Sequence, residues 1–208
     1  MVRVAVLVSG GGTNLQAILD AKAAGKLPHA ELALVVASKP GVYALQRAAG
    51  AGVKTAVVWR KTCPNSATFD EALLRVLQQN NIEVVVLAGF LSILGPSVIA
   101  AYSGRILNVH PSLIPSFCGK GFYGLKVHEA ALAAGVKVTG ATVHLVNEVP
   151  DGGKIVAQRA VRVHRGDDAA TLQRRVMEQA EWKLLPRAVE QLCAALWRAQ
   201  RNYKRKGV

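Results

Sequence analysis

The sequence contains few cysteines and few aromatic residues, and both shortages limit what the protein can be. Its three cysteines, Cys63, Cys118 and Cys193, are widely spaced and form no CxxC motif, so neither a disulfide framework nor a zinc site is expected. Only 5% of the 208 residues are aromatic, although 51% are hydrophobic, which predicts a largely aliphatic core. The cysteine pattern favours a reducing, cytoplasmic location.

Long apolar runs and acidic residues are also scarce. No apolar segment reaches the length needed to cross a bilayer, and residues 1–8 lack the cleavage pattern of a signal peptide, so no membrane partner is expected. The 26 Lys and Arg residues outnumber the 13 Asp and Glu residues, which gives a net charge of +13. This surplus can attract anionic small molecules. Nucleic acid is the less favoured partner, because RNA-binding aromatic patterns are absent.

The pattern of apolar residues predicts one domain over residues 1–208. Residues 2–9 form an apolar run interrupted by Arg3 and ended by Ser9, as in a strand buried on both faces. Further strands are expected at 32–38, 54–59, 83–88 and 105–110. Helices are expected to follow the first four strands, from about 14, 43, 67 and 96. This alternation predicts a doubly wound, Rossmann-like α/β fold with a mostly parallel sheet and helices on both faces.

The last third of the chain has a different pattern. A helix is expected at 125–134, and the segments 138–146 and 154–163 are expected to form an antiparallel pair of strands. A final helix is expected at 167–200, with an interruption near Pro186, because proline lacks the N–H that a helix uses. The basic tail at about 198–208 is interpreted as a solvated, weakly ordered end.

Two polar side chains end one of the predicted buried strands. Asn108 and His110 are two residues apart and therefore lie on the same face of the strand. Pro111 and Pro115 keep the exit from the strand extended. Asparagine offers an amide donor, and histidine is the side chain that ordinarily ionises near neutral pH. A histidine at a strand end is more often structural, so this pair alone does not establish a catalytic site.

A carboxylate in a glycine-containing turn changes that balance. Asp151 precedes Gly152 and Gly153 and is first of all a turn signal, because Asp bonds the neighbouring backbone and Gly accepts positive φ. The turn could lie beside the strand that ends at His110, where a carboxylate would favour the charged imidazolium. Amide, imidazole and carboxylate together suit acyl transfer, in which negative charge develops on an oxygen.

The loop after the first strand has the composition of an anion-binding turn. Residues 9–14 read SGGGTN, and glycines at the start of a helix let backbone N–H groups approach an anion. The GK[ST] of a P-loop is absent, and Leu15 stands where a dinucleotide fingerprint has its third glycine. The loop therefore predicts a site for a single phosphate group, with a plain tight turn as the alternative.

Four motifs together resemble one enzyme family. The segments SGGGTNL at 9–15, LAGFL at 87–91, LNVHPSLIP at 107–115 and DGG at 151–153 match phosphoribosylglycinamide formyltransferase in order and spacing. Each motif alone is weak, but the ordered set is specific, and the resemblance extends from Val2 to about Pro186. It implies that a formyl group passes from the co-substrate 10-formyltetrahydrofolate to the amine of 5-phosphoribosylglycinamide in purine biosynthesis, without a metal.

The resemblance also implies roles for individual residues. The catalytic positions are those of Asn108, His110 and Asp151. The substrate phosphate is expected at Gly12, Thr13 and Asn14, and the substrate ribose at Glu181. The residues expected to bind folate are Leu91, Ser92, Ile93, Leu94, Asn108 and His144.

The chain departs from the family pattern in places. Leu91 and Ser92 stand where the family often has Met-Arg, and Ser66 lies near the position of an Arg that contacts folate in some members. That arginine contact is therefore in doubt. The loop 117–126 is longer than the usual version and is expected to alter the lid over the amine.

Related folate enzymes and a non-enzyme remain as alternatives. Formyltetrahydrofolate deformylase and methionyl-tRNA formyltransferase use the same chemistry with an added N-terminal or C-terminal domain, so a chain with one predicted domain fits them less well. A nucleotide-binding module without catalysis explains the glycine loop but leaves the placement of Asn108, His110 and Asp151 to chance. Small-molecule substrates are the expected partners, and a homodimer is left open.

Overall fold

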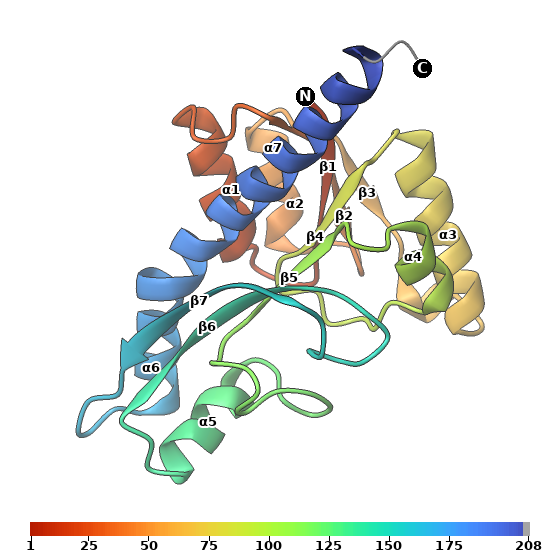
Figure 1. Cartoon of the computed structure of the whole chain (residues 1–208). Helices are drawn as coiled ribbons and strands as arrows, with labels where there is room; N and C mark the ends of the chain where they lie inside the picture. The colour runs from red at the N-terminus through yellow and green to blue at the C-terminus, as the bar shows by residue number, and fades with distance from the viewer. Residues whose placement is uncertain (206–208) are drawn as a thin grey trace.

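The computed structural model describes residues 1–205, with side chains described as far as residue 203. Seven strands form one sheet in the order β3-β2-β1-β4-β5-β6-β7 (Figure 1). Strands β1 to β5 pair in parallel, whereas β6 pairs antiparallel with both β5 and β7. The predicted doubly wound sheet with an antiparallel C-terminal extension is therefore confirmed.

The parallel half of the sheet alternates with helices. Its strands are β1 (Val2–Val8), β2 (Ala30–Ala37), β3 (Thr55–Val57), β4 (Val84–Leu87) and β5 (Ile106–His110). The helices are α1 (Thr13–Ala23), α2 (Tyr43–Gly50), α3 (Ser66–Gln79) and α4 (Pro96–Ala101), and a 3-10 turn at Arg60–Thr62 precedes α3. Of these strands, β3 differs most from the expectation, because it is an edge strand and keeps only three residues in the ladder.

The C-terminal third supplies the antiparallel strands and the longest helix. Its elements are α5 (Leu125–Ala133), β6 (Val138–Leu145), β7 (Ile155–Arg162), α6 (Ala169–Val176), a π-helical turn (Met177–Glu181) and α7 (Trp182–Arg205). The interruption expected near Pro186 was misplaced, since the irregular turn comes earlier and Pro186 lies inside α7. Pro186 falls in the opening turns of α7, directly after a wider turn has shifted the hydrogen-bond ladder, so its missing N–H does not end the helix.

The basic tail is more ordered than the sequence suggested. Helix α7 continues to Arg205, so the weakly ordered end is wrong for residues 198–205, while 206–208 lie outside the described residues. Gln200 Nε2 donates to Glu83 Oε1 at 2.6 Å, and the Arg201 guanidinium stacks on the Trp197 ring. The Gln200–Glu83 hydrogen bond fastens this part of the helix beside the N-terminal end of β4, whereas the Arg201–Trp197 contact lies within α7.

Two apolar layers cover the sheet, one on each face. Along β1, Val2, Val4, Val6 and Val8 pack with apolar residues of α1, α2, α6 and α7. Ala5 and Leu7 point the other way, toward the residues of α3 and α4. Both sets are fully buried, which is why the first strand is apolar apart from the partly buried Arg3. Within residues 1–205, no helix is long and apolar enough to span a bilayer.

The loops that follow β1 and β4 meet at the carboxyl edge of the sheet. Strands β1 and β4 are neighbours. The strands that follow β1 are added on one side of this pair, and the strands that follow β4 are added on the other side. The Ser9 N–H donates to the Gly89 carbonyl at 3.1 Å, and the Leu91 N–H donates to Ser9 Oγ at 2.9 Å. Such a reversal of strand order is where open α/β sheets bind ligands.

Candidate active site

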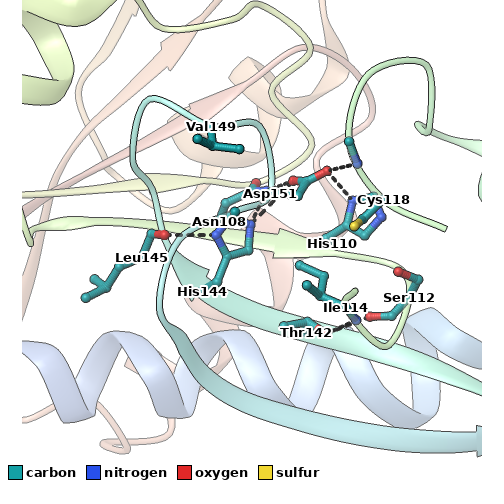
Figure 2. A network of polar contacts seen from close by, with 12 residues as sticks. Asn108, His110, Ser112, Ile114, Cys118, Thr142, His144, Leu145, Val149 and Asp151 are labelled. Atoms are coloured by element: carbon teal, nitrogen blue, oxygen red, sulfur yellow. Dashed lines mark hydrogen bonds and ion pairs between the residues drawn. The ribbon is translucent and has the colours of Figure 1, made fainter. Parts of the chain in front are cut away.

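Strands β5 and β6 bring three polar side chains to the carboxyl edge. Asn108 and His110 alternate along β5, as predicted, and the antiparallel register places Asn108 opposite His144 on β6. His110 is 5% exposed and His144 is 1% exposed. Their side chains gather beneath the turn that carries Asp151 (Figure 2). The sequence expectation that Asn108, His110 and Asp151 come together is met by this arrangement.

Asp151 approaches this cluster from the turn between β6 and β7. It adopts the left-handed conformation, with φ +55°, which aspartate tolerates better than most residues. Gly153 must be glycine at this turn, because a Cβ there would collide with the Leu145 carbonyl oxygen. The turn is thus closed tightly against the end of β6, and it aims the Asp151 carboxylate at β5.

Four groups contact the Asp151 carboxylate: a backbone N–H, a side-chain amide and two imidazoles. The Gly119 N–H donates to Oδ2 at 2.9 Å, and His110 Nδ1 lies 3.5 Å from the same oxygen. Asn108 Nδ2 and His144 Nε2 each lie 3.4 Å from Oδ1. Burial alone would raise the pKa of Asp151, but the contact with His144, the Gly119 N–H and charge on the imidazoles outweigh it, and the pKa lies below its ordinary value. Asp151 is therefore ionised at neutral pH.

Both ring nitrogens of His110 face acceptors. Nε2 lies 2.9 Å from the Phe117 carbonyl oxygen, and because a carbonyl only accepts, Nε2 must carry a hydrogen. Nδ1 faces the Asp151 carboxylate, which also only accepts. Two acceptors on opposite sides of the ring favour the doubly protonated imidazolium. In this arrangement the loop after β5 covers His110, and a reacting oxygen would replace the Phe117 carbonyl as the partner of Nε2.

Hydrogen bonds to β6 hold the exit from β5. Thr142 Oγ1 donates to the Ser112 carbonyl at 2.7 Å and accepts from the Ile114 N–H at 3.1 Å. Ser112 Oγ donates to the Ser116 carbonyl at 2.5 Å. Figure 2 shows this second cluster beside the His110–Asp151 pair. It fixes the start of the loop whose next residues, Phe117 and Gly119, contact the pair.

A third buried histidine lies near His110. His128 on α5 is fully buried, and among the described residues neither of its ring nitrogens has a hydrogen-bond partner. Burial, and then the positive charge of His110, lower the pKa of His128 to about 4. His128 is therefore neutral near pH 7 and does not compete with His110 for the charge.

The segment that follows the glycine loop contacts the π-helical turn that precedes α7. Gly12 caps α1 with φ +74°. Asn14, in the first turn of α1, is 8% exposed, and its Nδ2 donates to Glu181 Oε2 at 2.5 Å. Burial raises the pKa of Glu181 despite the opposing hydrogen bond from Asn14. The residues expected to hold the substrate phosphate and ribose therefore touch one another, although they are far apart in sequence.

One protein family matches most of the chain. The profile described as formyl transferase matches residues 2–189, which includes every element that carries the site. The chain belongs to the formyl transferase family.

Named relatives of this family are similar over most of the chain. Phosphoribosylglycinamide formyltransferase of Haemophilus influenzae is 40% identical over 190 residues, which cover 91% of this chain and 86% of that protein. The trifunctional purine biosynthetic protein adenosine-3 of Homo sapiens is 44% identical over 190 residues. These cover 90% of this chain but 18% of that protein, so the chain spans less than a fifth of this multifunctional relative.

Solved structures support the same relationship. Glycinamide ribonucleotide transformylase 1 of Symbiobacterium toebii has a TM-score of 0.88 and 39% identity, with 94% of this chain and 89% of that chain covered. Phosphoribosylglycinamide formyltransferase of Bacillus halodurans has a TM-score of 0.84 and 38% identity, with 91% and 94% covered.

Two cavities mark where ligands of a formyl transferase could lie. The smaller, about 140 Å³, is lined on one side by Asn108, His144 and Asp151, and on the other by residues of the predicted folate segment, Ser92, Ile93 and Leu94. The larger, about 690 Å³, runs along α1 and the start of α7 from Thr13, and carries Arg47, Lys183 and Arg187. Asn108 and Asp151 do not line the larger cavity, and His110 lines neither cavity.

Some expected site residues lie outside these cavities. Leu91 is 66% exposed and contacts Ser9 through its backbone N–H. Ser66, at the position of the family's folate-contacting arginine, is the first residue of α3. Within the described residues, no group of three or more His, Cys, Asp or Glu side chains could hold a metal ion.

Sequence reasoning missed the backbone groups that contact Asp151 and His110, and it missed the second imidazole beside Asp151. The Gly119 N–H and the Phe117 carbonyl carry no side-chain signal, and His144 was assigned only to the folate site. The pairing of His144 with Asn108 depends on the β5–β6 register. Alternation showed that these segments were strands but not which residues lay opposite each other.

Gly12 offers a test of what the glycine loop requires. We expect Gly12→Ala to lower the free energy of unfolding by about 2 kcal/mol, because left-handed φ costs alanine about 1–2 kcal/mol and overpacking adds a further penalty. The new Cβ would lie 2.7 Å from the Ala44 Cβ of α2. Urea unfolding provides the measurement. Gly11→Ala is the matched control, since its Cβ meets nothing within 4 Å; equal stability of the two variants would contradict this account.

Proposed function

We propose that this chain transfers a formyl group from 10-formyltetrahydrofolate to the amine of 5-phosphoribosylglycinamide, in cytoplasmic de novo purine biosynthesis. The observation that carries the proposal is the contact of Asn108 and His110 with the ionised Asp151 at the carboxyl edge of the sheet. The names of relatives that are about 40% identical over 90% of the chain support the same reaction.

The proposed chemistry is a direct transfer between two bound substrates. The amine attacks the formyl carbon, a carbon–nitrogen bond forms, and the formyl oxygen becomes negative. Asn108 donates an amide hydrogen to that oxygen, and the His110 imidazolium adds positive charge beside it. The bond from the formyl carbon to the folate nitrogen then breaks. That nitrogen takes a proton through His110, which regains one from the attacking amine.

The two ligands are placed at opposite ends of the site. The phosphate would lie against the N–H groups of Gly12, Thr13 and Asn14, where the start of α1 favours negative charge. Glu181, held by Asn14, would accept from the ribose hydroxyl groups. The folate ring would enter the smaller cavity beside residues 92–94. Its formyl group would then face Asn108, which lines that cavity.

A formyltetrahydrofolate deformylase is the second candidate, because water in place of the amine would use the same three residues. The Asn14–Glu181 contact behind the glycine loop favours the phosphoribosyl substrate, since water needs no site of that kind. A methionyl-tRNA formyltransferase would also need a surface for its nucleic acid.

The deciding assay follows tetrahydrofolate release spectroscopically, with and without 5-phosphoribosylglycinamide. Release that depends on this amine supports the proposal, whereas equal release in its absence would identify a deformylase.

We expect His110→Ala to lower kcat by about 10²–10³-fold, the typical cost of losing one oxyanion donor, with KM for both substrates little changed. Near-normal turnover of a folded His110→Ala protein would remove His110 from the mechanism.

The pH profile of Asp151→Asn tests the charge on the carboxylate. Because the pKa of Asp151 is below its ordinary value, the wild-type carboxylate stays ionised from pH 5 upward. The amide variant keeps the shape but no longer favours the His110 imidazolium. We expect kcat to fall at neutral pH and to recover partly as the pH is lowered, because protonation restores the imidazolium. Recovery is incomplete, since the attacking amine is itself protonated in acid.

NMR of the same two proteins separates an electrostatic role of Asp151 from a purely structural one. NMR of the His110 ring in both proteins reports the protonated fraction directly. An unchanged fraction in Asp151→Asn would mean that Asp151 acts only by shaping its turn.

A further inference from the structure

His144 lines the smaller cavity together with Asn108 and Asp151. Its side chain is 2% exposed. It reaches three partners: the Asn108 amide, the Asp151 carboxylate and the Leu145 backbone carbonyl (Figure 2). The pairing with β7 shifts between Val143 and His144, and the extra residue, Val156, lies on β7.

Hydrogen positions in this cluster follow from the contacts. The ionised Asp151 only accepts, and Asn108 Nδ2 lies 3.4 Å from its Oδ1, so the amide nitrogen of Asn108 faces the carboxylate. The same nitrogen lies 3.1 Å from His144 Nε2. An amide nitrogen only donates, and therefore Nε2 presents its lone pair.

The other ring nitrogen of His144 confirms this assignment. Nδ1 lies 2.9 Å from the Leu145 carbonyl oxygen, which only accepts, so Nδ1 carries the hydrogen. Neutral His144 with its hydrogen on Nδ1 satisfies the contacts with Asn108 and Leu145. In this tautomer the 3.4 Å approach of Nε2 to Asp151 Oδ1 is not a hydrogen bond. A charged His144 would force the Asn108 amide to turn its oxygen toward Nε2. That oxygen would then face Asp151 Oδ1 as well, lone pair against lone pair.

The arrangement leaves Asn108 with one hydrogen committed and one available. The shorter contact, to His144, holds the first amide hydrogen. The second points toward Asp151 across 3.4 Å, a long and weak hydrogen bond, at the wall of the smaller cavity. An incoming oxygen that becomes negative can therefore accept a hydrogen bond from this second N–H, because only a weak hydrogen bond to Asp151 is lost.

We propose that His144 is a positioning residue for the transfer: as the neutral Nδ1–H tautomer, it accepts one amide hydrogen of Asn108 and aims the other at the oxygen that becomes negative. Its effect on rate rests on the proposed formyl transfer. Its hydrogen positions do not, because they follow from contacts within the protein. The Leu145 carbonyl acts as the fixed group that selects the tautomer, much as backbone carbonyls orient histidines that bind metals.

The first test reads the tautomer without any substrate. Two-bond ¹⁵N–¹H NMR spectra of the full chain at pH 8 distinguish Nδ1–H, Nε2–H and imidazolium forms of each of the five histidines. The His144 signals are those lost in His144→Gln and kept in His29→Gln. The expected pattern is a protonated Nδ1 and an unprotonated Nε2. An Nε2–H tautomer or an imidazolium at pH 8 would overturn the proposal whatever reaction the protein catalyses.

The second test reads the consequence for catalysis. We expect His144→Leu, which removes the acceptor, to lower kcat about 10–100-fold, the range typical for residues that orient catalytic groups, with KM for folate changed less than twofold. His144→Gln retains a carbonyl oxygen that can accept from Asn108, and should recover most of the loss. Thermal unfolding of both variants separates this effect from destabilisation.

The outcomes of the second test are distinguishable. Equal kcat losses in the Leu and Gln variants, with both folded, would contradict positioning through the acceptor. A rise in KM alone would make His144 a folate contact instead. Absence of formyl transfer in the wild-type protein would refute the proposed function while leaving the NMR result to decide the tautomer.

Discussion

The ionised carboxylate of Asp151 joins segments that are far apart in the sequence. Through His110 and Asn108 it contacts β5, through His144 it contacts β6, and through the Gly119 N–H it contacts the loop that leaves β5. A buried carboxylate without these partners would be costly. The contacts offset that cost, and they fix in return the orientation of every side chain to which a catalytic or positioning role is proposed.

This arrangement depends on the antiparallel half of the sheet. Because β6 runs antiparallel to β5, its last residue pairs with Leu107 near the start of β5, and from there the chain turns toward β7. The turn places Asp151 over Asn108 and His110, at the cost of a left-handed aspartate and an obligatory glycine at position 153. The parallel half has a separate role, because it presents the glycine loop at the start of α1, where the substrate phosphate is proposed to bind.

The sequence predicted the parts of this structure that local patterns determine. Continuous apolar runs located the buried strands, and the i, i+2 spacing placed Asn108 and His110 on one face. The contact of Asp151 with this pair was expected because a turn signal followed a strand. Local patterns do not determine register, backbone partners or long-range contacts. The facing of His144 and Asn108, the Phe117 carbonyl and the Asn14–Glu181 hydrogen bond therefore became visible only in three dimensions. The break at 177–181 was misplaced because proline is a strong local signal, whereas a π-helical turn has no clear one.

The central claim is that Asp151 acts through His110, and a double-mutant cycle tests it most directly. The measurement is kcat for Asp151→Asn, His110→Ala and the double variant under saturating substrates. If the carboxylate works by holding the imidazolium, the double variant should be about as slow as the slower single variant, as expected for residues that act as a unit. If the two losses multiply instead, Asp151 and His110 contribute independently, and the carboxylate does not organise the site as described.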